Sequence, residues 1–200
     1  SNVGRSVHTL AVKATNRFEA TRDKIQKYLN AKHREEIIFT KGATEAINLV
    51  ASSYGKKYIK EGDEVLITEL EHHSNYVPWN YLRTDKGAVI KFAKVNENGD
   101  VEIEEIKKLI TNKTKIIAIT HISNVTGAIL PITKIVDLAK EKNIPVLIDG
   151  TQGAPHSEID MQKIGCDFYA ISCHKMYGPN GLGVLLSLIH ISEPTRPDYI

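Results

Sequence analysis

The stretch Cys166-Asp-Phe-Tyr-Ala-Ile-Ser-Cys-His-Lys175 is an apolar run that ends in a hydroxyl, an imidazole and an amine. This pattern predicts a buried strand whose carboxyl end opens into a cleft. A second apolar run upstream, Pro145-Val-Leu-Ile-Asp149, ends in a carboxylate. Two strands that each end in a chemically active group are typical of an α/β sheet with a ligand site at its carboxyl edge.

Lys175 and Asp149 are the residue types that pyridoxal phosphate requires. An amine is a covalent catalyst only when it is neutral and near a carbonyl group, and a carboxylate keeps a pyridinium nitrogen protonated. Each residue alone has an ordinary alternative, since a lysine after a strand is usually a solvated charge and many α/β strands end in aspartate. Their combination with phosphate donors and the turn Gly178-Pro-Asn-Gly181 favours a pyridoxal phosphate site.

The rest of the chain alternates helical and strand patterns, without an internal repeat or a low-complexity linker. It predicts one continuous α/β unit with a largely parallel sheet, right-handed crossovers and flanking helices. The expected strands are residues 36–40, 64–68, 88–93, 115–120, 145–149, 167–172 and 183–186. The expected helices are residues 6–31, a helix that opens at Gly42, and residues 74–86, 101–111 and 132–142.

The segment Thr40-Lys-Gly-Ala-Thr44 ends one expected strand and begins a helix. Free backbone N–H groups, the positive helix end and the Thr44 hydroxyl can hold a phosphate there. For Thr44 alone, an ordinary helix cap is the simpler interpretation. Ser172 and His174 also lie at a strand end, however, and can supply further donors to the same phosphate.

Two polar loops follow other expected strands. In Leu70-Glu-His-His-Ser-Asn75, one imidazole can stack on a cofactor ring and exchange protons. Adjacent histidines usually point apart, a loop histidine is often only a surface residue, and zinc would require spaced ligands. In Thr120-His-Ile-Ser-Asn-Val-Thr-Gly127, Asn124 can contact a substrate or cofactor oxygen, with a plain polar turn as the alternative.

Composition is that of a soluble enzyme domain. The 200 residues are 42% hydrophobic, with a net charge of +2 and interleaved acids and bases, so neither nucleic acid nor an anionic membrane is expected as a partner. There is no spanning apolar run and no signal-peptide core, which favours a cytoplasmic location. The two cysteines, Cys166 and Cys173, are too few for a disulfide framework and are expected to pack as small residues.

Five motifs resemble the class V aminotransferases, and within them the Suf-type (group II) cysteine desulfurases and the selenocysteine lyase-like enzymes. The paired histidines with Asn75 and Pro78-Trp79 are the most specific of these motifs. The resemblance covers residues 1 to about 185 and implies the large domain of a type I pyridoxal phosphate enzyme of the aspartate aminotransferase kind. The motifs are Thr40-Lys-Gly-Ala-Thr-Glu-Ala-Ile-Asn-Leu-Val50, Glu71-His-His-Ser-Asn-Tyr-Val-Pro-Trp79, Ser123-Asn-Val-Thr-Gly127, Asp149-Gly-Thr-Gln152 and Ser172-Cys-His-Lys-Met-Tyr-Gly-Pro179.

The same resemblance implies a role for each site residue. Lys175 would form the Schiff base, and His72 would stack on the ring and move protons. Asp149 would pair with the pyridine nitrogen and Gln152 with the phenolic oxygen. The phosphate would be held by Thr44, Ser172 and His174 with the Ala43 amide, and Asn124 would lie beside cofactor and substrate.

The sequence departs from this pattern in places. Cys173 stands where a small residue such as glycine is usual, and Thr151 replaces a common alanine. We expect residues 1–186 to be an incomplete large domain that also lacks an amino-terminal strand segment. Residues 187–200 resemble translated sequencing-adapter sequence and are excluded from fold reasoning. The small carboxy-terminal domain, the sulfur-accepting cysteine and the carboxylate-binding arginine are expected beyond residue 186.

For a full-length parent, the resemblance implies a homodimeric enzyme that removes sulfur from L-cysteine. It would leave L-alanine and an enzyme persulfide, which passes sulfur to an acceptor protein for iron–sulfur cluster assembly. Two alternatives stay open within the family: a selenocysteine lyase acting on L-selenocysteine, or another class V enzyme such as an aminotransferase or epimerase. A third is a noncatalytic cofactor-binding or interaction fragment, which truncation makes a serious possibility.

Overall fold

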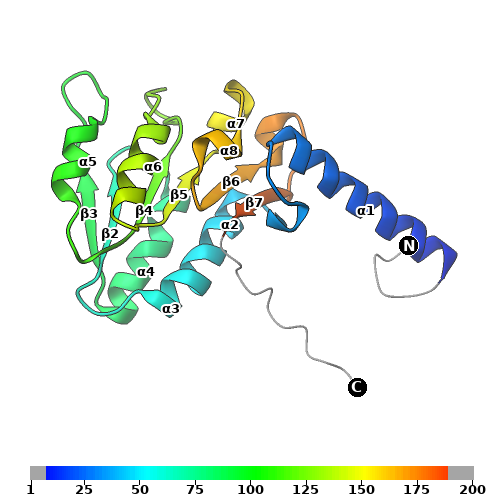
Figure 1. The fold of residues 1–200 in the computed structure, drawn as a ribbon, viewed down its shortest axis with the longest axis horizontal. Coiled ribbons are helices and arrows are strands. Elements are labelled where there is room, and N and C mark those ends of the chain that lie inside the picture. The colour runs from blue at the N-terminus through cyan, green and yellow to red at the C-terminus, as the bar shows by residue number, and fades with distance from the viewer. Residues whose placement is uncertain (1–7, 189–200) are drawn as a thin grey trace.

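A seven-stranded sheet forms the centre of the computed structural model, which describes residues 8–188 (Figure 1). Its spatial order is β1-β7-β6-β5-β4-β2-β3, so neighbours in the sheet are often distant in sequence. All seven expected strands are present, each with ends within one residue of the prediction. They are β1 Ile37–Thr40, β2 Glu64–Thr68, β3 Val89–Ala93, β4 Thr114–Thr120, β5 Val146–Asp149, β6 Phe168–Ser172 and β7 Gly183–Ser187.

Strands β2 to β6 run parallel, whereas β7 is antiparallel to both β6 and β1. Gly183, the first residue of β7, pairs with Thr40 on one side and Ser172 on the other. The carboxyl ends of β1, β2, β4, β5 and β6 therefore meet at the same edge of the sheet. The largely parallel α/β fold predicted from the sequence is confirmed.

Helices cover both faces of the sheet (Figure 1). The expected helix 74–86 is divided into a 3₁₀ turn and α4, because Pro78 in the first turn of α4 suits a helix start and not an interior. The expected helix 101–111 is shorter, and a π turn and several short helices were not predicted. The helices are α1 Thr9–Tyr28, α2 Ala43–Val50, α3 Lys56–Tyr58, α4 Val77–Lys86, α5 Ile103–Leu109, α6 Ile132–Glu141, α7 Gly153–His156 and α8 Met161–Ile164, with 3₁₀ turns η1 Arg34–Glu36, η3 His73–Asn75 and η4 Cys173–Met176 and the π turn η2 Ala51–Gly55.

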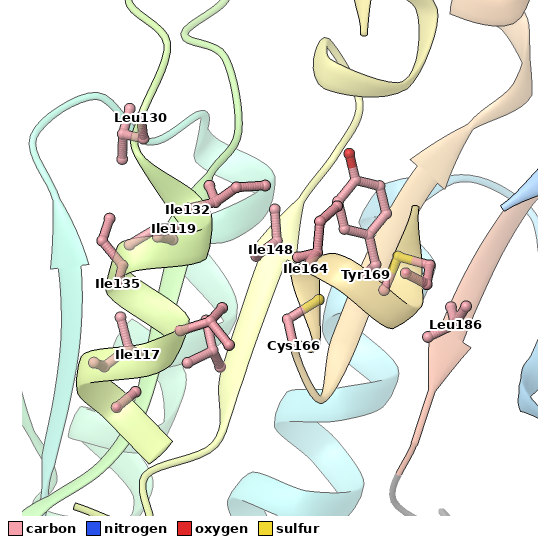
Figure 2. Close-up of a cluster of buried hydrophobic side chains, with 14 of the residues drawn as sticks. Ile117, Ile119, Leu130, Ile132, Ile135, Ile148, Ile164, Cys166, Tyr169 and Leu186 are labelled. Atoms are coloured by element: carbon pink, nitrogen blue, oxygen red, sulfur yellow. The ribbon is translucent and has the colours of Figure 1, made fainter. Parts of the chain in front are cut away.

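Alternation along the strands creates two hydrophobic cores, because successive side chains point to opposite faces of a sheet. In β2, Leu66 faces the core beneath α5, α6 and α8, while Val65 and Ile67 face the core beneath α2 and α4. Figure 2 shows the first core, in which side chains of α6, α8, β4 and β5 interdigitate beside Tyr169. The two cores fix the sheet between its helical layers and so fix the edge where the strands end.

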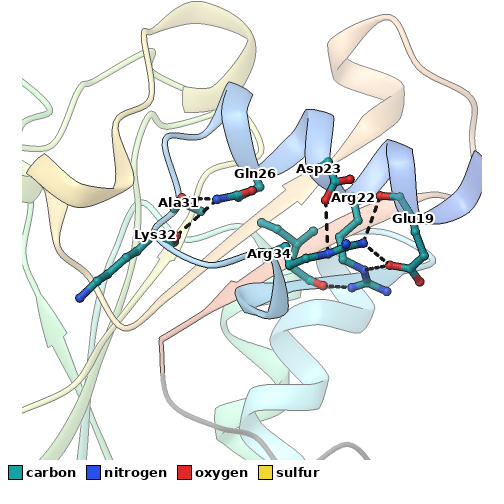
Figure 3. Close-up of polar contacts among 8 residues, drawn as sticks. Glu19, Arg22, Asp23, Gln26, Ala31, Lys32 and Arg34 are labelled. Carbon is teal, nitrogen blue, oxygen red and sulfur yellow. Dashed lines mark hydrogen bonds and ion pairs between the residues drawn. The ribbon is translucent and has the colours of Figure 1, made fainter. Parts of the chain in front are cut away.

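A cluster of ion pairs and hydrogen bonds joins the long helix α1 to the edge of the sheet formed by β1 (Figure 3). Arg34 of η1 forms ion pairs with Glu19 at 2.6 Å and Asp23 at 3.3 Å. Arg22 pairs with Glu19 and donates to the Ile37 carbonyl of β1. These contacts join α1 to the strand that leads into the Thr40–Thr44 turn.

The predicted boundary at residue 187 lies at the end of the described chain. Ser187 is the last residue of β7 and pairs with Phe168. The rest of the proposed adapter-derived tail lies outside the described residues, apart from Leu188. Among the described residues, no helix is long and apolar enough to cross a membrane.

Candidate active site

One cavity of about 190 Å³ lies at the carboxyl ends of the strands and is lined by all nine site residues predicted from the sequence. Two hollows elsewhere, of about 470 and 560 Å³, are larger but contain none of these residues. The chemistry of the lining, and not the volume, therefore marks the candidate site. The nine residues are Ala43, Thr44, His72, Asn124, Asp149, Gln152, Ser172, His174 and Lys175.

Four lining residues had no role assigned from sequence: Ser74, Thr120, Ile122 and Thr151. Each belongs to a segment already singled out, and Thr151 directly precedes Gln152. Motif membership could have suggested them, but alternation along a loop does not reveal which neighbour faces inward. Among the described residues, no group of three or more histidine, cysteine, aspartate or glutamate side chains could hold a metal ion.

The amino end of α2 forms one corner of the cavity. The Ala43 amide donates to Ser172 Oγ at 2.9 Å, which leaves the serine hydroxyl hydrogen free to donate outward. The next amide, that of Thr44, has no intrahelical partner because it lies in the first turn. Ala43 thus orients Ser172, while the Thr44 amide and the positive helix end remain able to bind an anion.

Asp149 ends β5 and is only 4% exposed. One of its carboxylate oxygens accepts the Thr151 amide at 3.0 Å, and it forms no ion pair with any cation among residues 8–188. The Thr151 hydroxyl is also buried and lacks a partner in this part of the chain. A buried carboxylate without a countercharge is costly, so this corner of the cavity favours a cationic ligand.

The two loop histidines behave differently. His72 lines the cavity and His73 does not, and their rings are nearly perpendicular with centroids 6.0 Å apart. The Ser74 amide donates to His72 Nδ1 at 3.2 Å, and the Ser74 hydroxyl lies 2.8 Å from the same nitrogen. In a neutral His72 ring the proton therefore resides on Nε2, which can donate to a ligand.

Lys175 and His174 lie in η4, immediately after β6, and both side chains are exposed. Neither cysteine lines the cavity. Cys166 is fully buried in the core, where burial raises its thiol pKa, and the partly buried Cys173 packs against the same core. The expectation that both pack as small residues is confirmed.

The loop that carries Gln152 rests on a buried pair that sequence reasoning missed. His121 Nδ1 lies 2.9 Å from the Tyr169 hydroxyl, and burial lowers the pKa of His121. A Cβ atom on Gly150 would lie 2.0 Å from the Tyr169 ring, and one on Gly153 would lie 2.1 Å from His121 Nδ1. Only glycine at these two positions lets the loop lie on the pair and present Gln152 to the cavity.

The family model described as "Aminotransferase class-V" matches residues 1–197 of this sequence. The chain belongs to the class V aminotransferase family. Curated relatives include a probable cysteine desulfurase from Halalkalibacterium halodurans, which is 50% identical over 185 residues and covers 92% of this chain and 46% of that protein. The chain thus spans about half the length of this class V relative.

Solved structures agree with the class V assignment and with the fold. The cysteine desulfurase CsdA from Escherichia coli has a TM-score of 0.85 and 38% identity over 94% of this chain and 47% of its own. A structure described as SspA in complex with cysteine has a TM-score of 0.86 and 29% identity over 92% of this chain and 52% of its own. The α/β architecture is that of the large domain in type I pyridoxal phosphate enzymes.

Proposed function

We propose that this chain is the cofactor-binding part of a pyridoxal phosphate-dependent cysteine desulfurase. The observation that carries the proposal is the meeting of Lys175, Asp149 and the amino end of α2 in one cavity. An amine, a carboxylate and an anion site are the three groups that the carbonyl, ring nitrogen and phosphate of this cofactor require. The likeness to proteins described as cysteine desulfurases supports the substrate class.

The residues present fit the cofactor. Asp149 is a buried carboxylate without a described countercharge, as a pyridinium partner would be. The Ser172 hydroxyl and Thr44 amide retain free donors at the helix end, where a phosphate is favoured. In this proposal His174 completes the phosphate site and Gln152 donates to the phenolic oxygen, while Asn124 contacts cofactor and substrate.

Pyridoxal phosphate, when bound, supplies a protonated aromatic ring that withdraws electron density from the substrate. Lys175 would hold the cofactor covalently, and its free amine would move protons at the substrate. His72 would cover the ring face and could exchange a proton at Nε2. Asp149 would keep the ring nitrogen protonated.

Further parts of the proposal concern a full-length protein containing this chain. There, a cysteine thiolate would attack the substrate sulfur, an arginine would hold the substrate carboxylate, and L-alanine would leave. The enzyme persulfide would pass sulfur to an acceptor protein for iron–sulfur cluster assembly. We further propose a cytoplasmic homodimer.

Borohydride reduction tests the central assignment. It fixes the cofactor on the lysine that holds it, and peptide mapping then identifies that residue. The expected modified peptide contains Lys175. Modification of a different lysine, or none at all, would disprove the proposed site.

A second candidate function applies to the 200 residues by themselves: a cofactor-binding unit without turnover. It is favoured by the lining of the cavity, which contains neither cysteine nor arginine among the described residues. Positioning of reacting groups can supply about 7–11 kcal/mol, so a missing nucleophile would stop the reaction. We expect this chain to release no alanine from cysteine. Multiple-turnover alanine release that is lost in Lys175→Ala would refute this second candidate.

A further inference from the structure

Glu71 is a half-buried acid to which the proposed chemistry assigns no role. Its carboxylate lies between the ends of β2 and β4 and accepts three hydrogen bonds. Thr68 Oγ1 and the Thr120 amide donate to Oε1 at 2.6 and 2.9 Å, and Asn75 Nδ2 donates to Oε2 at 2.7 Å. One carboxylate therefore joins two strand ends to the turn η3.

The direction of these hydrogen bonds is fixed by Trp79. Its indole N–H, which can only donate, lies 3.1 Å from Asn75 Oδ1, and both residues are fully buried. The Asn75 amide must therefore point its NH₂ group at Glu71. Thr68 Oγ1 accepts the Leu70 amide at 3.1 Å, so its own hydrogen is free for Glu71. Both oxygens of Glu71 consequently face donors.

This network borders the candidate site. Glu71 immediately precedes His72, and Thr120 lines the cavity and pairs with Asp149 across β4 and β5. Burial, with a smaller effect from the Asp149 charge, raises the pKa of Glu71 to about 7 against the lowering effect of its hydrogen bonds. Neither Glu71 nor Asp149 forms an ion pair with a cation among residues 8–188, so two carboxylates share this corner.

We propose that Glu71 is a positioning residue that holds His72 over the cavity and, when ionised beside a cationic ring, adds a second negative charge behind Asp149. The inference rests on the proposed cofactor and deepens it. A charged acceptor satisfies all three donors, whereas an amide at the same place cannot. In Glu71→Gln, an NH₂ group in place of Oε2 would face the Asn75 NH₂ group, and one in place of Oε1 would face the Thr120 N–H. Rotating Asn75 to accept from the glutamine would turn its NH₂ group toward the Trp79 N–H.

The first test compares Glu71→Gln with Glu69→Gln in a full-length protein containing this chain. Glu69 is an exposed acid two residues earlier on the same connection and serves as the matched control. Titration of the apoprotein with pyridoxal phosphate should show binding weakened about tenfold in Glu71→Gln, as for one charged hydrogen bond, and unchanged in Glu69→Gln. The pH at which the bound cofactor changes its absorbance should fall by roughly 0.5 unit or more, which a purely structural role would not cause.

The second test is rescue. Trp79→Phe removes the indole N–H, which frees the Asn75 amide to rotate and accept from the introduced glutamine. Glu71→Gln and Trp79→Phe together should therefore lower the melting temperature less than their separate effects add up to. Should Glu71→Gln fail to fold, Thr68→Val removes a single donor and should shift cofactor affinity in the same direction. Wild-type affinity and absorbance in Glu71→Gln, or strict additivity with Trp79→Phe, would overturn the inference. Failure of the unmutated protein to bind pyridoxal phosphate would instead overturn the proposed function.

Discussion

Two glutamates lie at opposite ends of the same strand and differ in what surrounds them. Glu64 begins β2, where Lys91 Nζ lies 2.9 Å from its carboxylate and Thr111 and Thr114 donate to it at 2.6 and 3.1 Å. Glu71 lies three residues beyond the end of β2, with neutral donors and the charge of Asp149 nearby. Both acids are withdrawn from water.

The charge of the neighbours decides the outcome. Burial works against ionisation at both sites, yet the hydrogen bonds and the Lys91 charge hold the pKa of Glu64 below its ordinary value. At Glu71 burial prevails and the pKa rises to about 7. At the amino end of β2, Glu64 thus has its own cation, whereas at the carboxyl end neither Glu71 nor Asp149 forms an ion pair among residues 8–188, an arrangement that suits a cationic ligand.

The largest expected effect comes from replacing a lysine at the carboxyl edge of the sheet, compared with replacing one at the amino edge. Lys175→Ala should abolish the cofactor's visible absorbance and lower turnover by roughly 10³-fold or more, because the covalent attachment and its proton transfer are lost. Lys115→Ala, at the amino end of β4, should leave both unchanged. Absorbance spectra and alanine release from the full-length variants measure this difference. Equal losses of absorbance and turnover in the two variants would contradict the proposed difference between the edges.

A smaller loss is expected from Asp149→Asn. A hydrogen bond to a charged group contributes about 1.5–3 kcal/mol and a neutral one about 0.5–1.5, so losing the charge should cost about 1–1.5 kcal/mol, a roughly tenfold decrease in turnover. Asp63→Asn, which breaks an ion pair with Lys115 at the amino edge, is the control. Turnover measured at saturating cofactor is the readout. Normal turnover in Asp149→Asn would remove this residue from the mechanism.

The contributions of Glu71 and Glu64 to the free energy of unfolding should change in opposite directions as the pH rises. The raised pKa of Glu71 means that its contribution to the free energy of unfolding is present below pH 4.5 and is lost as the pH rises through about 7, a change on the order of 3 kcal/mol. The lowered pKa of Glu64 means that its contribution is present above pH 4.5 and is lost as the pH falls further. Chemical denaturation of the apoprotein, with Glu71→Gln and Glu64→Gln each subtracted from wild type, measures both. If the two differences in the free energy of unfolding changed with pH in the same direction, the contrast between Glu71 and Glu64 would be wrong.

The smallest effect distinguishes neighbours within the carboxyl edge. His72→Ala should lower turnover about tenfold and disturb the cofactor spectrum, because His72 lines the cavity and can exchange a proton there. His73→Ala should change neither by a measurable factor. Rapid-reaction spectra of the two variants provide the comparison, and equal, negligible effects would restore a surface role for both histidines.

The strand ends were predictable because a buried strand is a short run of apolar residues that can be recognised in the sequence. The runs ending at Thr68, Asp149 and Ser172 are apolar and short, and each is followed by polar groups, so strand bounds and candidate residues could be inferred together. Helix ends were less certain, since the break before α4 depends on how Pro78 fits a first turn. The roles of the nine lining residues stay predictions until they are tested with bound cofactor.

The sequence by itself determined the alternating α/β order, the family motifs and the residue types that gather at one edge, because periodicity and strand ends are local properties. Only the tertiary structure decided that β7 lies between β1 and β6 and that Glu71 is held by Thr120. These features join segments far apart in sequence. The physical reason is that charge, burial and hydrogen-bond direction at a site are set by every neighbouring element, and a local pattern contains no record of its neighbours.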